Sequence, residues 1–476
     1  MMSITIFGVL IIAYCFYVLL CKKNNKAKFI HLFILSVFLY FNITIGYVVK
    51  IGNQTIAGYF LVTLLAGAMA LLLVKKVSIK LFIEIILLLA VIVAAIGLIP
   101  IKQYQIVDQN GWDWYLFGAN NITTCKLGFE QIKELIKALS FLMILSVIYT
   151  KIGEEDWIYI INKIIKWSKY VICYGIFEFV MVYIFRFYNL YSALLLPIFG
   201  IKESTYIFSM ERGSGHQLQG LFTEPSSYST GLFFIVLLFL MQLKYCKEGK
   251  NPKKANLRNI WIWIGICMVL MVLSMAFTAI LYLCFLAIIF VLFCYKNMPK
   301  MRSIIISSIG MITGLCIIGG YILLNSNTYY GERLRYALII FKETLNNNDF
   351  GNLYFYLSGV VNDGSSISRL GSSIGILKME FVQNIWCGLG IGVGNSHSLA
   401  SNMLTDLGIF GTFLWGKLVI GGYKAKKNIY FYVVFFMFIL VSFLCQPISM
   451  FGTDVIVLIF IFVNIFTSYV SPDRKK

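Results

Sequence analysis

Uninterrupted apolar runs of about 20 residues recur along this chain, and they restrict its fold more than any other feature. A helix of that length crosses the roughly 30 Å hydrocarbon layer of a bilayer. Hydrophobic residues make up 59% of the sequence and charged residues only 13%, against about a quarter charged in soluble domains. The sequence therefore predicts an all-α, polytopic membrane protein with a single integral membrane domain over residues 1–476.

The runs predict about thirteen transmembrane helices, within a range of about twelve to fourteen. The predicted spans are 2–21, 29–49, 56–74, 81–101, 133–150, 170–187, 228–243, 260–274, 279–295, 302–324, 399–420, 428–446 and 454–470. Lysine and arginine are about twice as frequent in alternate loops as in the opposite loops, and positive charge marks the cytoplasmic side. We therefore expect an external N-terminus and an internal C-terminus, and the net charge of +19 needs no nucleic acid partner. The first span lacks a small-residue cleavage pattern, so we do not expect a cleaved signal peptide.

The loops on the predicted outer side include three long ones, at 102–132, 188–227 and 325–398, whereas most inner loops are short and basic. Transporters built from repeated halves show matching segments in both halves, and this sequence shows none. Elaboration on one side predicts that the protein works at its outer face. Cys125 and Cys387 fall in these outer loops and could pair, although buried thiols are the default for the cysteines.

Two non-spanning segments have helical periodicity. The inner segment 151–169 predicts either a helix lying on the anionic inner leaflet or a simple interfacial connector. Its apolar face is formed by Trp157, Ile160, Ile161, Ile164 and Ile165. The outer segment "SSISRLGSSIGILKMEFVQNIW" predicts a helix capped by serines. Its apolar positions are Ile367, Leu370, Ile374, Leu377, Phe381 and Ile385.

One group of ionisable residues lies in "MERGSGHQLQGLFTEPSSYSTGLFF", directly before a span. It contains Arg212, His216 and Glu224. Pro225 favours an extended Glu224 and a helix that starts soon afterwards, with a serine near its N-terminal cap.

A second group combines Arg369, the glycine-alternating "GLGIGVGNSH" and Asp406. The glycines could let the backbone approach an anion closely, or could form a flexible turn. Small residues at helical spacing follow His397 and permit tight helix packing. Asp406 is expected either to act as a purely structural cap or to take part in helix packing or in a contact with a neighbouring span. Ionisable groups at membrane depth predict function, so His397 needs another explanation. Glu178 lies in the middle of a span as a buried proton-holding group without an assigned role.

These residue types suit one reaction. Guanidinium groups bind phosphate oxygens bidentately, and a histidine or carboxylate accepts a proton near neutral pH. A sugar on a lipid pyrophosphate is already activated, so its transfer requires stabilisation of the leaving diphosphate and deprotonation of an acceptor hydroxyl. Neither step requires a metal or another cofactor.

Three segments resemble one superfamily. "HSLASNMLTDLGIFG" is similar to the histidine motif of O-antigen ligases and polymerases, which ends in Gly-x-x-Gly, here Gly408 to Gly411. "RGSGHQLQGLFTEPSSYSTGLF" resembles the arginine-to-"F-x-E-P-S" segment of bacterial polysaccharide polymerases, and "SRLGSS…GLGIGVG" resembles their arginine-bearing outer loop. The likeness covers residues 200–420, and the N-terminal half matches by topology only. "LSMAFTA" stands where many relatives carry an arginine.

The resemblance implies a capsular or O-antigen polysaccharide polymerase in the bacterial cytoplasmic membrane, with loops 188–227 and 325–398 forming an active site on the outer side. Donor and acceptor would be glycans on undecaprenyl pyrophosphate, with membrane lipids, a flippase and a chain-length regulator as further partners. The resemblance makes His397 and Glu224 the catalytic candidates. The pyrophosphate- and glycan-binding candidates are Arg212, Arg369, His216 and Arg335. Two alternatives stay open: a ligase that transfers the glycan to lipid A, and a flippase, which would need more charges at the midplane than Glu178.

Overall fold

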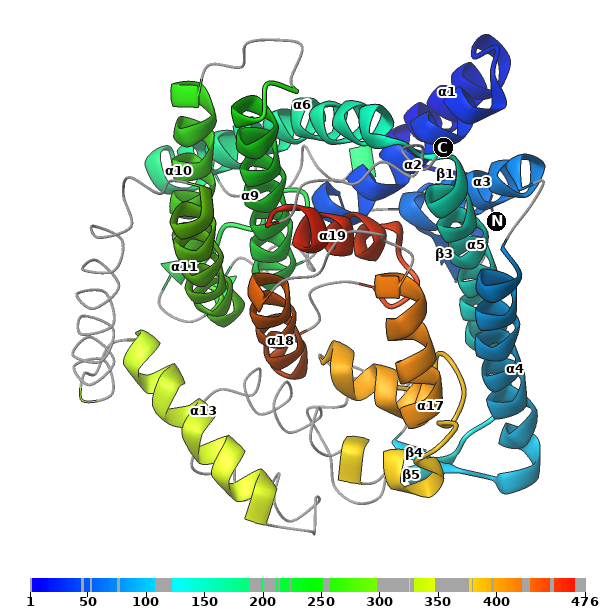
Figure 1. Cartoon of the computed structure of the whole chain (residues 1–476). Coiled ribbons are helices and arrows are strands. Elements are labelled where there is room, and N and C mark those ends of the chain that lie inside the picture. The colour runs from blue at the N-terminus through cyan, green and yellow to red at the C-terminus, as the bar shows by residue number, and fades with distance from the viewer. Residues whose placement is uncertain are drawn as a thin grey trace.

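The computed structural model describes the helices, the short strands and many of the connecting turns. The described residues are 2–43, 47–51, 54–74, 78–107, 122–187, 198–199, 211–212, 215–222, 224–250, 257–297, 325, 329–346, 376–378, 380–394, 398–421, 429–445 and 449–466. Within them the chain is all-α except for short strands at the loop ends (Figure 1).

A helix lies at every predicted span except 302–324, which falls outside the described residues. The helices are α1 (Ile6–Cys21), α2 (Asn25–Asn42), α3 (Gly58–Leu73), α4 (Ile79–Lys102), α5 (Phe129–Lys151), α6 (Glu154–Phe179), α9 (Pro225–Lys247), α10 (Leu257–Leu273), α11 (Phe277–Asn297), α13 (Tyr329–Asn346), α17 (Leu399–Gly421), α18 (Ile429–Leu444) and α19 (Thr453–Asn464). A π-helix, η3 (Val180–Ile184), continues α6, and a 3₁₀-helix, η6 (Phe381–Asn384), precedes α17.

Length and composition make 5 helices of the described part capable of crossing a membrane, and several shorter helices are also apolar. The long ones are Ile79–Lys102, Glu154–Ile184, Pro225–Lys247, Thr278–Lys296 and Leu399–Gly421. The prediction of an all-α, membrane-embedded chain is therefore confirmed, whereas the number of spans stays a prediction.

The centre of the bundle is formed by α2, α9 and α19 (Figure 1). Every residue of α19 is buried. Phe41 of α2 stacks on Phe234 of α9, with ring centroids 3.8 Å apart. A Cβ at Gly231 would overlap the carbonyl oxygen of Phe41, so the close approach of α9 and α2 depends on this glycine.

A cluster of buried hydroxyl groups ties three helices together. The Ser36 hydroxyl of α2 is hydrogen-bonded to Thr63 of α3 at 2.7 Å and to Thr453 of α19 at 2.8 Å. Buried hydroxyls are costly unless they are paired, so this cluster specifies how α19 sits against α2 and α3.

The predicted surface segment 151–169 is instead the first part of α6. Its apolar face is buried, and Trp157 stacks on Phe460 of α19 with ring centroids 3.8 Å apart. The segment runs without a break into the predicted span as far as Phe179. Neither the leaflet-surface helix nor the simple connector is correct, because the apolar face packs against α2 and α19 rather than against lipid.

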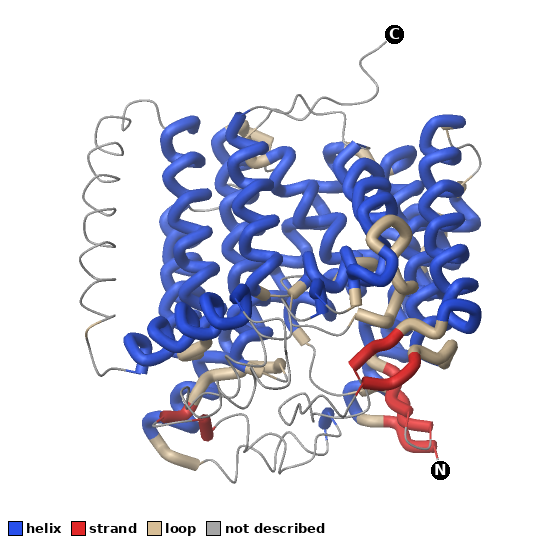
Figure 2. Tube along the Cα trace, turned by 90° about the horizontal axis from the view of Figure 1, so that it is seen from below, coloured by secondary structure: helices blue, strands red, loops and turns tan. Residues whose placement is uncertain are grey.

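The short strands share one end of the bundle (Figure 2). The antiparallel sheets are β1 (Met2–Ile4), β2 (Val49–Ile51) and β3 (Gln54–Ile56) in the order β1-β2-β3; β4 (Gln105–Val107) with β5 (Ile122–Thr124); and β6 (Glu211–Arg212) with β7 (Gly215–His216). We call this the strand end.

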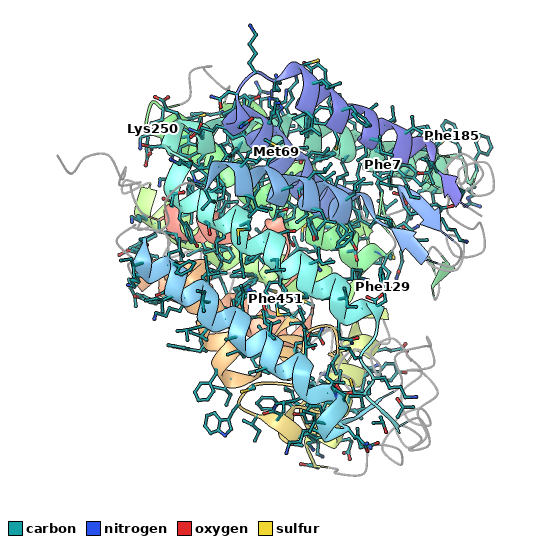
Figure 3. All side chains as sticks on the ribbon, turned by 90° about the vertical axis from the view of Figure 1, so that its right-hand side faces the viewer. Phe7, Met69, Phe129, Phe185, Lys250 and Phe451 are labelled. Carbon is teal, nitrogen blue, oxygen red and sulfur yellow. The ribbon has the colours of Figure 1, made fainter. Side chains whose placement is uncertain are left out.

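Lys250, which pairs with Glu154 at 2.6 Å and Glu248 at 2.9 Å, lies at the opposite end from Phe129 (Figure 3).

Candidate functional site

The structure places the predicted site residues to different extents. Glu224 and Arg335 are described with their side chains. Arg212 and His216 are placed through the backbone of β6 and β7. The residues outside the described ranges are Arg369 and His397. The site is therefore built from the segments that carry or flank these residues.

Arg212 and His216 belong to one tight hairpin. Arg212 pairs with Gly215, and Glu211 pairs with His216, across the β6–β7 ladder. The hairpin leads directly into the turn at 217–222 and then into α9. The predicted gathering of these residues just before a membrane helix is thus observed for the backbone.

Glu178 holds the turn between this hairpin and α9. Its side chain is completely buried. One carboxylate oxygen accepts the backbone N–H of Gln219 at 3.1 Å, and the other accepts that of Gly220 at 2.6 Å. Gly220 has a φ of 57°, which favours glycine. Glu178, to which the sequence alone assigned no role, therefore anchors the segment that carries Arg212, His216 and Glu224.

Glu224 is the N-terminal cap residue of α9. It is extended, with φ −145° and ψ 150°, and Pro225 is the first helical residue. The Ser226 hydroxyl donates to the Glu224 carboxylate at 2.9 Å. The extended Glu224 and the helix start are as predicted, but the cap position is held by Glu224 itself rather than by a serine. One carboxylate oxygen is thus oriented at the strand end of α9.

Segment 273–279, at which the sequence departs from the superfamily pattern that it resembles, forms a turn between α10 and α11. The hydroxyl of Ser274 is 2.7 Å from that of Ser229 on α9. The Leu218 N–H donates to the Leu273 carbonyl at 3.5 Å. Met275 has a φ of 50°. Here a hydroxyl pair joins the start of α9 to this turn.

The helix after His397 is broken at Gly408, where φ is 64° and ψ is −173°. The break leaves backbone groups of α17 without partners inside the helix, and these groups form hydrogen bonds with segment 385–390. The N–H groups of Ile409 and Phe410 donate to the carbonyls of Ile385 and Trp386 at 2.9 and 3.1 Å. Irregular backbone is tolerated in a membrane protein only where such groups find partners. The predicted uninterrupted span 399–420 is therefore two half-helices locked to the preceding loop.

The glycine-alternating segment, 388–394, wraps around Asp406. The Asp406 carboxylate accepts backbone N–H groups from Gly392 at 3.1 Å, Val393 at 3.2 Å and Gly394 at 2.6 Å. We call segment 388–394 the glycine loop. The sequence left open whether these glycines bind an anion or form a flexible turn; their amides bind a carboxyl group, which belongs to a side chain of the same protein. Asp406 thus caps backbone amides of the glycine loop, which is the purely structural role that the sequence left open, and not helix packing or a contact with a neighbouring span.

The alternation of the glycine loop has a packing reason. Leu389, Ile391 and Val393 are buried, and Leu389 and Val393 join a small core with the β4–β5 hairpin. A Cβ at Gly388 would overlap the backbone of Asp406. Apolar side chains therefore face the core, while Gly388 and Gly394 permit close approach to α17.

The predicted helix upstream of the glycine loop is present at residues 376–378, but it does not continue as far as Trp386. Its last residues form only the short η6 and a turn. The Gln383 side chain exchanges two hydrogen bonds with the backbone of Gln105, at 2.9 and 2.6 Å, and the Asn384 amide donates to the Gly388 carbonyl at 2.7 Å. These side-chain bonds compete with helical ones. The remainder, with Arg369, lies outside the described residues.

The two cysteines of the predicted outer loops do not form a disulfide bond with each other. Both Cys125 and Cys387 are free thiols. Burial raises the pKa of the Cys125 thiol to about 11. This thiol is therefore protonated at neutral pH and acts as a small core residue.

The two motif-bearing segments meet through α11 and α18. Next to His397, the Ser398 hydroxyl donates to the Ser442 carbonyl at 3.0 Å, and the Leu399 N–H donates to the Cys445 carbonyl at 3.3 Å. The Cys445 thiol lies 3.3 Å from the Tyr282 hydroxyl, which is hydrogen-bonded at 3.1 Å to Thr230 of α9. Side-chain and backbone contacts therefore connect the start of α17 with the first turns of α9. No sequence signal marked Tyr282 or Cys445 for this position.

Arg335 lies on α13 and is half-buried. In Figures 1 and 2, α13 runs across the bundle near its strand end instead of along it. Charged residues at both ends of this helix flank an apolar middle, a pattern that suits a position at an interface.

In the part of the chain that is described, no three histidine, cysteine, aspartate or glutamate side chains come together as metal ligands would. Comparisons with protein-family models, curated proteins and solved structures found no match. The family resemblance therefore rests on the motifs alone and enters as a proposal.

Proposed function

We propose that the protein is a bacterial polysaccharide polymerase that transfers a glycan from undecaprenyl pyrophosphate to another lipid-linked repeat unit. The observation that carries the proposal is the connection between the start of α9, which presents Glu224, and the start of α17, which follows His397. This connection brings the starts of two helices about 170 residues apart in sequence into one chain of contacts, as a site that uses both motifs requires. Transfer between two lipid-linked glycans is a task that uses both.

The proposed setting is the cytoplasmic membrane, with about thirteen spans and the reaction at its outer face. Alternating basic loops support this orientation, and the strand end of the bundle carries the backbone of both Arg212 and His216. The lipid pyrophosphate is anchored at the depth of the membrane surface, so its binding groups belong at the same end. Loops 188–227 and 325–398 would form the site.

In the proposed reaction an acceptor hydroxyl oxygen bonds to the anomeric carbon of the donor sugar. The bond from that carbon to the pyrophosphate breaks, and undecaprenyl pyrophosphate leaves with the electron pair. Arginine side chains suit the leaving group because the guanidinium is always charged and forms paired bonds to phosphate oxygens. Arg212 and Arg369 take this role in the proposal, with His216 and Arg335 as further contacts to pyrophosphate or glycan.

The hydroxyl proton passes to a base. His397 is the proposed base, and Glu224 is the second candidate because the Ser226 hydroxyl orients its carboxylate. General base catalysis contributes about 10²–10⁴-fold to such a step. The glycine loop has no proposed pyrophosphate role, because the amides of Gly392, Val393 and Gly394 are bound to Asp406.

The test uses purified protein in liposomes with undecaprenyl pyrophosphate-linked repeat units isolated from a capsule-producing strain. Wild-type protein should convert single repeats into a ladder of longer glycans. His397→Gln, which can donate and accept hydrogen bonds but cannot take a proton at neutral pH, should slow the ladder about 10²-fold or more. Glutamine activity near that of wild type would move the base role to Glu224.

Failure of the wild-type protein to elongate any repeat unit would refute the polymerase. Transfer of glycan to added lipid A would instead identify a ligase. In cells, a polymerase defect leaves single repeats displayed outside, whereas a flippase defect leaves them facing the cytoplasm. The location of the accumulated repeats therefore separates the enzyme from a transporter.

A further inference from the structure

Basic and aromatic side chains of α1, α2 and α6 meet at the end of the bundle away from the strand end. Figure 3 shows Phe7 of α1 and Phe185, which directly follows η3, at the opposite end from Lys250. Lys250 pairs with Glu154 at the start of α6. The end of α1, the start of α2 and the start of α6 therefore lie together, at the end that the basic loops predict to be cytoplasmic.

His31 of α2 is held through both of its ring nitrogens. Its Nδ1 lies 3.1 Å from the Tyr14 hydroxyl of α1, and its Nε2 lies 3.4 Å from the Tyr159 hydroxyl of α6. A tyrosine hydroxyl can donate or accept a hydrogen bond, so both contacts persist whether the imidazole is neutral or protonated. One side chain thus joins α1 and α6 to α2.

Two lysines next to His31 lie over aromatic rings. The Lys22 Nζ is 5.9 Å from the centroid of the Tyr17 ring, and the Lys163 Nζ is 5.7 Å from that of Trp167. Both positive charges act on the His31 ring, so they face it from two different elements. A ring face attracts an ammonium group without using its N–H donors as a carboxylate would. Those donors remain available for an anion.

The acidic residues of the described part leave these two lysines uncompensated. Among the described residues, neither Lys22 nor Lys163 forms an ion pair. The Asp156 carboxylate pairs with Lys26 at 2.6 Å and also accepts the Gly153 N–H at 2.9 Å. The lysine side chains are only partly buried, so an anion can reach them.

We propose that Lys22 and Lys163 bind the phosphate of an anionic phospholipid, while His31 holds together the three helices that carry them. Basic clusters between transmembrane helices on the cytoplasmic side bind anionic headgroups. Tyrosine and tryptophan rings, here Tyr17 and Trp167, are enriched at the headgroup level of a bilayer. This site lies at the other end of the bundle from the proposed transfer site and does not depend on it.

The surface beside Lys22 favours a lipid over a free phosphate. Phe16 and Leu20 flank Tyr17 on α1 and are 60% and 79% exposed. An acyl chain attached to the bound phosphate can lie along these apolar side chains, whereas inorganic phosphate gains nothing from them. Charge and apolar surface together match the two parts of an anionic phospholipid.

The test is native mass spectrometry of the full-length protein in detergent with added phosphatidylglycerol or phosphatidylcholine. Wild-type protein should retain phosphatidylglycerol preferentially, and excess inorganic phosphate should not displace it. A lysine near an anionic headgroup contributes about 1 kcal/mol, or about fivefold in affinity, so Lys22→Gln combined with Lys163→Gln should weaken binding about 25-fold. Equal retention of the two lipids, or displacement by inorganic phosphate, would overturn the proposal.

The matched control removes two other lysines that also lie over aromatic rings. Lys247 is 5.9 Å from the Phe293 centroid, and Lys296 is 5.5 Å from that of Tyr430. Lys247→Gln combined with Lys296→Gln removes the same charge and should leave phosphatidylglycerol binding within about twofold of the wild type. An equal loss in both double variants would show general attraction to positive charge and would refute a site at Lys22 and Lys163.

A measurement on unaltered protein keeps the test decisive if the lysine variants do not fold. The chain has 3 histidines, so solid-state NMR of protein labelled with [¹⁵N]histidine gives few signals, and His31→Gln assigns those of His31. Phosphatidylglycerol should shift the His31 signals, because a phosphate bound by the neighbouring lysines changes the field at the ring, and phosphatidylcholine should not. His31 signals that stay unchanged at saturating phosphatidylglycerol would overturn the site even where lipid is retained.

Discussion

Replacing Glu178 by glutamine removes the charge of a fully buried carboxylate while keeping its size. In the native protein both oxygens accept backbone N–H groups, from Gln219 at 3.1 Å and Gly220 at 2.6 Å. Glutamine offers one oxygen, so its NH₂ group faces an N–H. A buried N–H that loses its acceptor costs about 1–3 kcal/mol, so the free energy of unfolding should fall by about this amount.

The assay combines an apparent thermal midpoint in one detergent with hydrogen exchange of residues 217–222. Glu178→Gln should lower the midpoint and accelerate amide exchange at Gln219 and Gly220. The control is Glu84→Gln, whose partner Lys417 lies 3.3 Å away and is 48% exposed; such a pair contributes about 0–1 kcal/mol. Native exchange at Gln219 and Gly220 in Glu178→Gln would refute the anchoring role, whatever the midpoint.

Three further outcomes are expected. Gly408→Ala should destabilise the protein by at least about 1–3 kcal/mol, because its φ of 64° and ψ of −173° suit only glycine and a Cβ would overlap Trp386; Gly416→Ala, where a Cβ meets no atom within 4 Å, should change the thermal midpoint little. Arg369→Ala should cost about 2–4 kcal/mol in the transition state, with Arg369→Lys intermediate at best, so full-length polymer from normally expressed Arg369→Ala would remove this residue from the site. A reporter active only in the cytoplasm should be active when fused after Lys476, and silence there with activity near Gly364 would reverse the topology.

The helices could be predicted from sequence because apolar length is a property of each segment alone. Segment 151–169 shows that the partner of an apolar helix face cannot be predicted in the same way. Its apolar face has the same period whether it meets lipid headgroups or other helices, and only the positions of Phe460 and α2 decide that Trp157 is buried. Periodicity identifies a face but not its partner.

The candidate site was predictable in its residue types but not in its internal bonds. The glycines of 388–394 were compatible with a flexible turn or with an anion beside the backbone, and the Asp406 carboxyl group lies there. That this carboxyl group belongs to Asp406 depends on the break at Gly408, where α17 is hydrogen-bonded to the loop that precedes it. In sequence Gly408 resembles one more member of a small-residue packing face. Glu178 likewise had no visible partner, since Gln219 and Gly220 bind it through main-chain groups that every residue possesses.

The buried position of α19 has a consequence for how the protein is made. Every residue of this helix is covered by helices that precede it in the chain, and its Thr453 completes the hydroxyl cluster on Ser36. During synthesis α2 and α3 must therefore remain in the bilayer without the Thr453 partner of Ser36 until α19 emerges. A chaperone or the insertion machinery has the most time to act on the incomplete bundle in the interval between the insertion of α3 and the emergence of α19. Ribosome-bound chains that stop before α19 should be the form most sensitive to quality-control proteases.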